Sequence, residues 1–189
     1  MKKFLLMVLT FFLLTISVLG YAKNPEICAL LIAEPDMKTE DFMNKVHDCL
    51  KDNTNVVFGT EIQTKYQEYW LSKGQLEEGK PTPEVLFEFR KYSGYKKCLY
   101  IITDVKTEKS SVPAGLFGLA RVERTRASVN IKGFLVGEDI TGTEKILKVI
   151  SATEQADSET SDLRAKRGAF ERSMKKLVKE FDVYLQSRK

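Results

Sequence analysis

The stretch RASVNIKGFLV, residues 126–136, decides the fold. Small or apolar residues occupy every second position and share one face: Ala127, Val129, Ile131, Gly133 and Leu135. A two-residue period is that of a β-strand with one face on a core. The next run, GEDITGT at 137–143, contains Asp, Thr and two Gly, which favour a reversal of chain direction. The sequence therefore predicts a hairpin formed by this strand and a strand that follows the turn.

A long amphipathic helix is predicted after the hairpin. Its apolar residues recur at helical spacing and form one stripe: Leu163, Phe170, Met174, Leu177, Val178, Phe181 and Leu185. Such a stripe needs an apolar surface to pack on, and the hairpin offers one. We therefore expect a C-terminal hairpin covered by a long amphipathic helix.

Three short apolar runs nearer the N-terminus predict further strands, at residues 26–33, 55–59 and 97–105. Helical spacing predicts one helix between the first two strands and two helices between the second and the third. Strands separated by helices favour parallel pairing, whereas the hairpin requires antiparallel pairing. The predicted fold class is α/β (α+β), with a mixed sheet of about five strands flanked by helices. We expect a single domain spanning residues 23–189.

Residues 1–22 have the pattern of a secretory signal peptide. Lys2 and Lys3 precede an apolar run at 4–19, and small residues follow at the positions that a signal peptidase reads. The run is a little shorter than the roughly 20 residues of a membrane span, so we expect cleavage, with a retained membrane anchor as the alternative. A lipid anchor is not expected, because Cys28 lacks the small residues of a lipidation site. The protein is thus expected in the periplasm, outside the cell or associated with the cell envelope.

The charge balance argues against a nucleic-acid partner. The chain has 30 basic and 26 acidic residues, and removing Lys2 and Lys3 leaves 28 against 26, a formal charge of +2. Such a nearly neutral exported chain lacks the basic excess that binds phosphate backbones. We expect the partners to be envelope proteins or further copies of the chain.

Three cysteines, Cys28, Cys49 and Cys98, remain after cleavage, and an exported protein can oxidise them. At most one intramolecular disulfide can form, and the sequence does not say which two would pair. Each cysteine has apolar neighbours, so buried free thiols are an equal alternative. No C-x-x-C spacing occurs and His47 is the single histidine, so we expect neither a metal site nor a cofactor.

Several motifs, taken in order, resemble those of one envelope superfamily. They are the helix start Thr82-Pro83-Glu84, the strand Leu99-Tyr100-Ile101-Ile102, the turn Asp139-Ile140-Thr141-Gly142 and the terminal helix with Leu163-Arg164-Ala165. The superfamily includes the amino-terminal domain of the Tol-system propeller protein, the curli secretion channel subunit and the lipoprotein activator of penicillin-binding proteins. The resemblance covers most of the chain after the signal and implies a non-enzymatic domain that binds other envelope components. The sequence lacks a lipidation cysteine and a pair of channel-lining hairpins, so the resemblance implies no pore or synthase-activating role.

Few residues support enzyme chemistry. His47 would have to serve any Ser-His or Cys-His pair. The carboxylates that could act as acid and base lie around a turn and near a strand end: Glu138, Asp139, Glu154, Asp157 and Glu159. Solvated surface charge is the alternative for all of them, and no G-x-S-x-G, Walker or H-E-x-x-H motif is present. No catalytic residue is therefore assigned, and a secreted carboxylate-dependent hydrolase is kept as an alternative function.

The segment VPAGLFGLA, at 112–120, is apolar but too rich in Gly and Pro for a regular element, and the wider stretch 106–121 has no periodicity. Leu116, Phe117 and Leu119 are candidates for contact with a partner or a membrane. The alternative is that they fold back and close one end of the core. Four aromatic residues pose a similar choice between a recognition surface and the core: Tyr66, Tyr69, Trp70 and Tyr92.

The predicted last helix has a basic face, on which Arg167, Lys175 and Lys176 are further candidates for partner contact. Such a face can meet an acidic partner or lie on an anionic membrane. The alternative is a solvated face with ion pairs such as Glu171 with Lys175. The sequence therefore predicts an exported, non-enzymatic cell-envelope protein that binds or assembles through protein–protein contacts. The alternatives are the hydrolase and a homo-oligomeric structural subunit.

Overall fold

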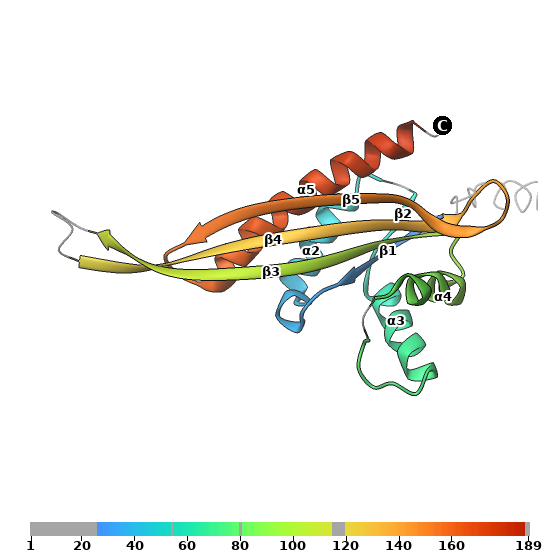
Figure 1. Cartoon of the computed structure of the whole chain (residues 1–189), viewed down its shortest axis with the longest axis horizontal. Helices are drawn as coiled ribbons and strands as arrows, with labels where there is room; N and C mark the ends of the chain where they lie inside the picture. The colour runs from blue at the N-terminus through green and yellow to red at the C-terminus, as the bar shows by residue number, and fades with distance from the viewer. Residues whose placement is uncertain (1–25, 54, 80, 115–119, 188–189) are drawn as a thin grey trace, which may run out of the picture.

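The structure is a computed structural model that describes residues 26–53, 55–79, 81–114 and 120–187. The five strands of its sheet are β1 (Ile27–Ile32), β2 (Val56–Val57), β3 (Lys97–Ala114), β4 (Ala120–Glu138) and β5 (Glu144–Ser158). The helices are the 3₁₀ turn η1 (Pro35–Met37), α2 (Glu40–Leu50), α3 (Thr60–Ser72), α4 (Pro83–Ser93) and α5 (Asp162–Gln186). Helices lie on both faces of the sheet (Figure 1). The predicted α/β fold class is confirmed.

The sheet has the order β2-β1-β3-β4-β5 and is mixed. β1 pairs in parallel with β2 and β3, whereas β3 with β4 and β4 with β5 are antiparallel. The predicted division into a parallel first half and an antiparallel second half is therefore confirmed. β1 lies between two strands and between two helical layers, which explains why its sequence is apolar throughout.

One face of the sheet packs on α2 and α5. Val129, Ile131 and Leu135 of β4 are buried there against the apolar stripe of α5, as the two-residue period predicts. At Gly133 a Cβ atom would lie 3.0 Å from Leu177 Cδ1, so glycine permits the close approach of the helix. The predicted hairpin, β4 with β5, is thus covered by the predicted helix (Figure 1).

The other face packs on α3 and α4 around an aromatic cluster. Tyr66, Tyr69 and Trp70 of α3 are buried against Phe89 of α4, and the Tyr66 and Phe89 ring centroids are 4.9 Å apart in an edge-to-face arrangement. Tyr100 of β3 lies beneath them, and its hydroxyl donates to the Leu86 carbonyl oxygen at 2.5 Å. These aromatics belong to the core. Tyr92, at the rim, is 47% exposed.

β3 and β4 form a hairpin that is longer than the rest of the sheet. β1 accompanies β3 only as far as Ile102, and β5 accompanies β4 only from Thr125 onwards. The last five pairs of the ladder, 110–114 with 120–124, are therefore two-stranded. We call these residues the arm; it forms the end of the molecule opposite the β4–β5 turn (Figure 1).

The prediction that 106–121 is irregular is wrong for its described part. Residues 106–114 continue β3, and Ala120 with Arg121 begin β4. The physical reason is that both faces of the arm meet solvent, so neither face needs apolar residues and no alternation marks the strands. Pro113 is tolerated because the outer edge of β3 has no neighbouring strand there.

Candidate functional site

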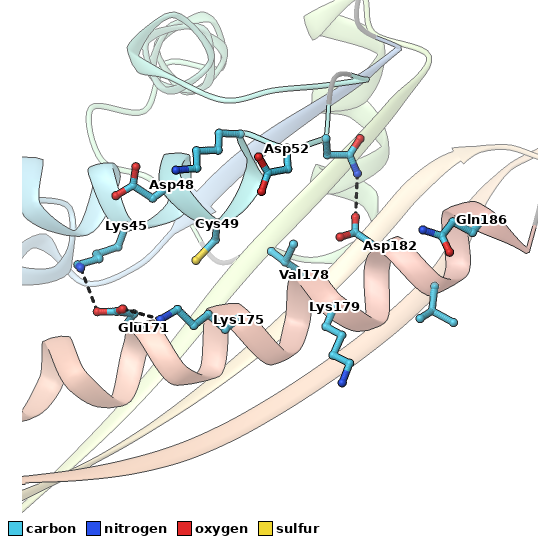
Figure 2. Close-up of a pocket in the computed structure, with 13 residues that line it drawn as sticks. Lys45, Asp48, Cys49, Asp52, Glu171, Lys175, Val178, Lys179, Asp182 and Gln186 are labelled. Atoms are coloured by element: carbon cyan, nitrogen blue, oxygen red, sulfur yellow. Dashed lines mark hydrogen bonds and ion pairs between the residues drawn. The ribbon is translucent and has the colours of Figure 1, made fainter.

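A groove lies between α2 and α5 (Figure 2). The two helices also contact each other through Phe42 and Phe170, whose ring centroids are 5.2 Å apart. The groove has a volume of about 650 Å³. Its principal lining residues are Lys45, Asp48, Cys49, Lys51, Asp52, Asn53, Glu171, Lys175, Val178, Lys179, Asp182 and Gln186.

One ion pair, Lys45 with Glu171, and one hydrogen bond, from the Asn53 side-chain amide to Asp182 Oδ1 at 3.0 Å, join the two walls of the groove (Figure 2). Glu171 Oε2 lies 3.0 Å from Lys45 Nζ, and its Oε1 lies 2.8 Å from Lys175 Nζ. Lys175 and Lys45 together hold the pKa of Glu171 below its usual value. Four lysines and four acidic residues line the groove, so the groove has no net formal charge to select an anion or a cation.

Cys49 is half-buried on the α2 side of this groove, and its thiol points towards α5 (Figure 2). Burial raises the pKa of the Cys49 thiol, so the thiol is protonated at neutral pH and is a weak nucleophile. The arrangement can hold a polar group between two helices, but it does not activate the sulfur. The sequence prediction missed this groove because its two walls come from helices more than a hundred residues apart.

Cys28 and Cys98 lie directly opposite each other on the adjacent parallel strands β1 and β3. Both are fully buried free thiols on the α3 and α4 side of the sheet, whereas Cys49 lies on the α2 and α5 side. A hydrogen bond with Cys98 and burial hold the pKa of Cys28 far above its usual value. Of the three possible pairs, the register brings together only Cys28 and Cys98.

The candidate acid and base residues are not brought together as a pair. Glu154 lies opposite Val129 on the α5 face of the sheet and forms an ion pair with Lys176. Asp157 lies opposite Arg126, on the other face, where Arg126 holds the pKa of Asp157 below its usual value. Glu159 lies at the far end of β5, in the connection to α5.

The carboxylates near the β4–β5 turn have structural contacts. Arg90, only 8% exposed, donates to Glu144 Oε2 at 2.6 Å and to Glu138 Oε1 at 2.9 Å, which ties α4 to the hairpin. In the turn itself, Asp139 Oδ1 accepts from the backbone N–H groups of Thr141 and Thr143. A hydrogen bond from Lys145, together with these donors, holds the pKa of Asp139 well below its usual value.

His47 is exposed on α2, and its backbone carbonyl oxygen accepts a bond from the Lys51 N–H. Among the described residues, no three His, Cys, Asp or Glu side chains gather closely enough to hold a metal ion. Across the same residues, none of the helices combines the length and apolar character that crossing a membrane requires.

The basic candidates on α5 are each engaged with an acid. Arg167 forms an ion pair with Asp41, and Lys176 with Glu154. Lys175 pairs with Glu171 one turn earlier, as the spacing of four residues predicts. Whether these residues also contact a partner or a membrane stays a prediction.

The remaining candidates, Leu116, Phe117 and Leu119, lie outside the described residues, and in the sequence they fall between the two strands of the arm. Val112 and Val122 pair across the arm and are half-buried, whereas Pro113, Arg121 and Glu123 are exposed. Where the arm leaves the sheet, Asp162 at the start of α5 accepts a hydrogen bond from Thr125 Oγ1 at 2.6 Å. Lys109 Nζ lies 3.1 Å from the same carboxylate.

No protein-family model matches the chain, and no curated protein matches it. Solved structures with a similar arrangement include a lipoprotein from Neisseria meningitidis, with 15% identity, 86% of this chain and 95% of that chain covered, and a TM-score of 0.43. A hypothetical protein from Chlamydia trachomatis has 12% identity, coverages of 86% and 95%, and a TM-score of 0.37. The rare lipoprotein B from Shewanella oneidensis has 14% identity, coverages of 85% and 92%, and a TM-score of 0.29.

All three TM-scores lie below 0.5, so these structures do not establish a relationship or a shared function. The resemblance to the superfamily of the Tol-system propeller protein, the curli channel subunit and the activator lipoprotein stays a prediction. The fold class stands on the sheet and helices described above.

Proposed function

We propose that the protein is an exported, non-enzymatic binding protein of the cell envelope that works through protein–protein contacts made by the β3–β4 hairpin. One observation carries the proposal: the last five pairs of this hairpin stand beyond both β1 and β5. Five strand residues span roughly 15 Å, at about 3.4 Å per residue. A solvated two-stranded extension of this length adds nothing to the core, which favours a role in contact with another molecule.

Export is proposed from the pattern of residues 1–22, which lie outside the described part of the chain. The apolar candidates Leu116, Phe117 and Leu119 are proposed contacts because, in the sequence, they fall between the two strands of the arm. Val112 and Val122, which pair with each other two pairs before the last described pair of the ladder, extend the same apolar character into the described strands.

The hydrolase alternative has less support. Glu154 and Asp157 lie on opposite faces of the sheet, so they cannot flank one scissile bond. The Cys49 thiol is kept protonated by burial, which makes it a weak nucleophile. Contact of α5 with an anionic membrane is also less supported, because Arg167, Lys175 and Lys176 would first have to exchange their acidic partners.

The proposal is tested by site-specific photo-crosslinking in intact cells of the source organism. A photoreactive amino acid replaces Arg121, an exposed residue of the arm, and in a matched control replaces Glu68, an exposed residue of α3. We expect a discrete adduct with an envelope protein from position 121 and none from position 68. The proposal fails if both positions give the same adducts, or if position 121 gives none at native abundance. Cell fractionation in the same experiment tests export independently, because a cytoplasmic chain would contradict it.

A further inference from the structure

β5 forms one edge of the sheet, with a register shift at Leu147 and with the Gln155 carbonyl oxygen accepting a hydrogen bond from Arg172. It is the last strand in the sheet order, and within the described residues its ladder partner is β4 alone. The strand has 15 residues, so a long row of backbone N–H and C=O groups faces outwards on that side. Such an edge can accept a further strand by continuing the sheet.

The other edges of the sheet are protected against such pairing. β2 has only 2 residues. Farther along β1, where β2 has ended, the Gln63 side-chain amide of α3 accepts from the Leu31 N–H at 3.0 Å and donates to the Leu31 carbonyl oxygen at 3.3 Å, with the amide oxygen and nitrogen assigned from these contacts. The free edge of β3 has four charged residues, Asp104, Lys106, Glu108 and Lys109, and Pro113 near its end, both of which disfavour strand addition. β5 contains no proline, and its middle is uncharged.

The sequence of β5 is self-complementary about Ser151. In KVISATE, residues 148–154, Lys148 and Glu154 stand three residues to either side of Ser151 and have opposite charge. Between them lie five uncharged residues, among which Val149, Ile150 and Thr153 are strong strand formers. We propose that two copies of this chain pair antiparallel through their β5 edges, centred on Ser151, to form one continuous ten-stranded sheet around a twofold axis.

Strand geometry selects this register. Two residues that lie opposite each other in an antiparallel pair point to the same face of the sheet. Because side chains alternate between the two faces along a strand, two identical strands meet this condition only if the twofold axis passes through a residue and not between two residues. Lys148 and Glu154 both lie on the α5 face, opposite Leu135 and Val129 of β4. Only the axis at Ser151 places the lysine of each copy opposite the glutamate of the other, and it does so twice. The same register places Val149 opposite Thr153, and Ile150 opposite Ala152.

The surroundings of the edge match the incoming carboxylate. A groove of about 620 Å³ lies between β5 and the C-terminal half of α5, lined by Lys148, Lys176, Lys179, Glu180, Val183, Tyr184 and Ser187. Its three lysines outnumber its one acid, so it has a net positive charge. The Glu154 of a second copy would exchange the Lys176 of its own chain for this Lys148, which now lies over the Tyr184 ring, and would reduce that excess. Val183, 61% exposed on α5, would be covered by the second copy.

Charge reversal tests the pairing in the purified protein, with the dissociation constant measured by analytical ultracentrifugation. Lys148→Glu and Glu154→Lys each place two like-charged pairs across the axis, so each is expected to weaken the dimer at least about tenfold. The double variant K148E/E154K restores opposite charges, and its dissociation constant should return to within about threefold of the original. Lys106→Glu, on the exposed part of β3, is the matched control and should leave the dimer unchanged.

Disulfide trapping tests the position of the axis. In a Cys49→Ser background, Ser151→Cys places two thiols opposite each other across the axis, at a Cα separation of about 4.5 to 5.5 Å that a disulfide can bridge. Thr153→Cys is equally exposed, but the two copies of residue 153 are about 14 Å apart along the strands in this register. Diamide, which accepts the two electrons and two protons of the thiols, should crosslink the first variant and not the second.

The proposal is overturned by a protein that stays monomeric at about 100 μM. It is also overturned by a dimer that tolerates both charge reversals, or by equal crosslinking at positions 151 and 153. If the chain is a monomer and Lys148→Glu instead removes the binding of a different protein, the edge holds a foreign strand and the self-pairing is wrong. The arm lies outside this interface, so its crosslinking result is independent of these outcomes.

Discussion

The two ends of the β3–β4 hairpin are made of the same two strands but have opposite surroundings. At one end, Val129, Ile131 and Leu135 are buried beneath α5, with β1 and β5 on either side. At the other end, the arm has no flanking strand and exposes Pro113, Arg121 and Glu123. The hydrophobic effect therefore stabilises one end, while the other depends on cross-strand pairs and on its attachment to the first.

This difference predicts where the protein opens. Backbone hydrogen bonds in the supported end break only when the sheet unfolds, whereas those in the arm can open locally. Hydrogen exchange followed by mass spectrometry should show amides of 129–135 protected at least about a thousandfold more than those of 110–114 and 120–124. Equal protection of both segments would mean that the arm packs on something or folds as one unit with the sheet.

A pair of truncations measures the same difference as stability. Ile131→Ala removes a fully buried side chain beneath α5 and should lower the free energy of unfolding by about 2–5 kcal/mol. Val122→Ala, in the arm, should change it by no more than about 0.5 kcal/mol, because its side chain remains partly in water. Urea denaturation at pH 7, with the slope of the transition unchanged, gives both values. Similar losses from the two variants would contradict the division of the hairpin.

The same physics decides what the sequence could predict. A buried face forces alternation on β4 and a helical stripe on α5, so the covered hairpin was predictable from Val129, Ile131 and Phe170 without any structure. The arm was not, because strands with water on both faces need no alternation. Apolar residues alternate along a strand because one of its faces is buried, and the alternation is absent where neither face is buried.

Contacts between elements that are far apart in the sequence could not be predicted either. The ion pair of Lys45 with Glu171 depends on α2 packing beside α5, and the facing of Cys28 and Cys98 depends on β1 lying next to β3. Element order along the chain is compatible with several strand orders, so neither contact follows from local pattern. The seven central residues of β5 show its self-complementarity in the sequence alone. That pattern suggests pairing between copies only because the structure places β5 at an edge of the sheet.

The smallest expected effect concerns Asp162, where the supported end meets the arm. The Thr125 hydroxyl and Lys109 hold the pKa of this carboxyl below its usual value, so the charged form is favoured in the folded protein. A depressed pKa stabilises the fold above the unfolded pKa of about 3.9, and the contribution is lost as the pH falls through the folded value. Asp162→Asn retains an oxygen that can accept from Thr125 but removes the charge. Urea denaturation should therefore show a variant slightly less stable than the original protein at pH 7 and pH 5, with the difference shrinking as the pH falls below about 3.9. A difference that is the same at every pH would show that the charge at this junction contributes nothing, and that the arm is attached by the strands alone.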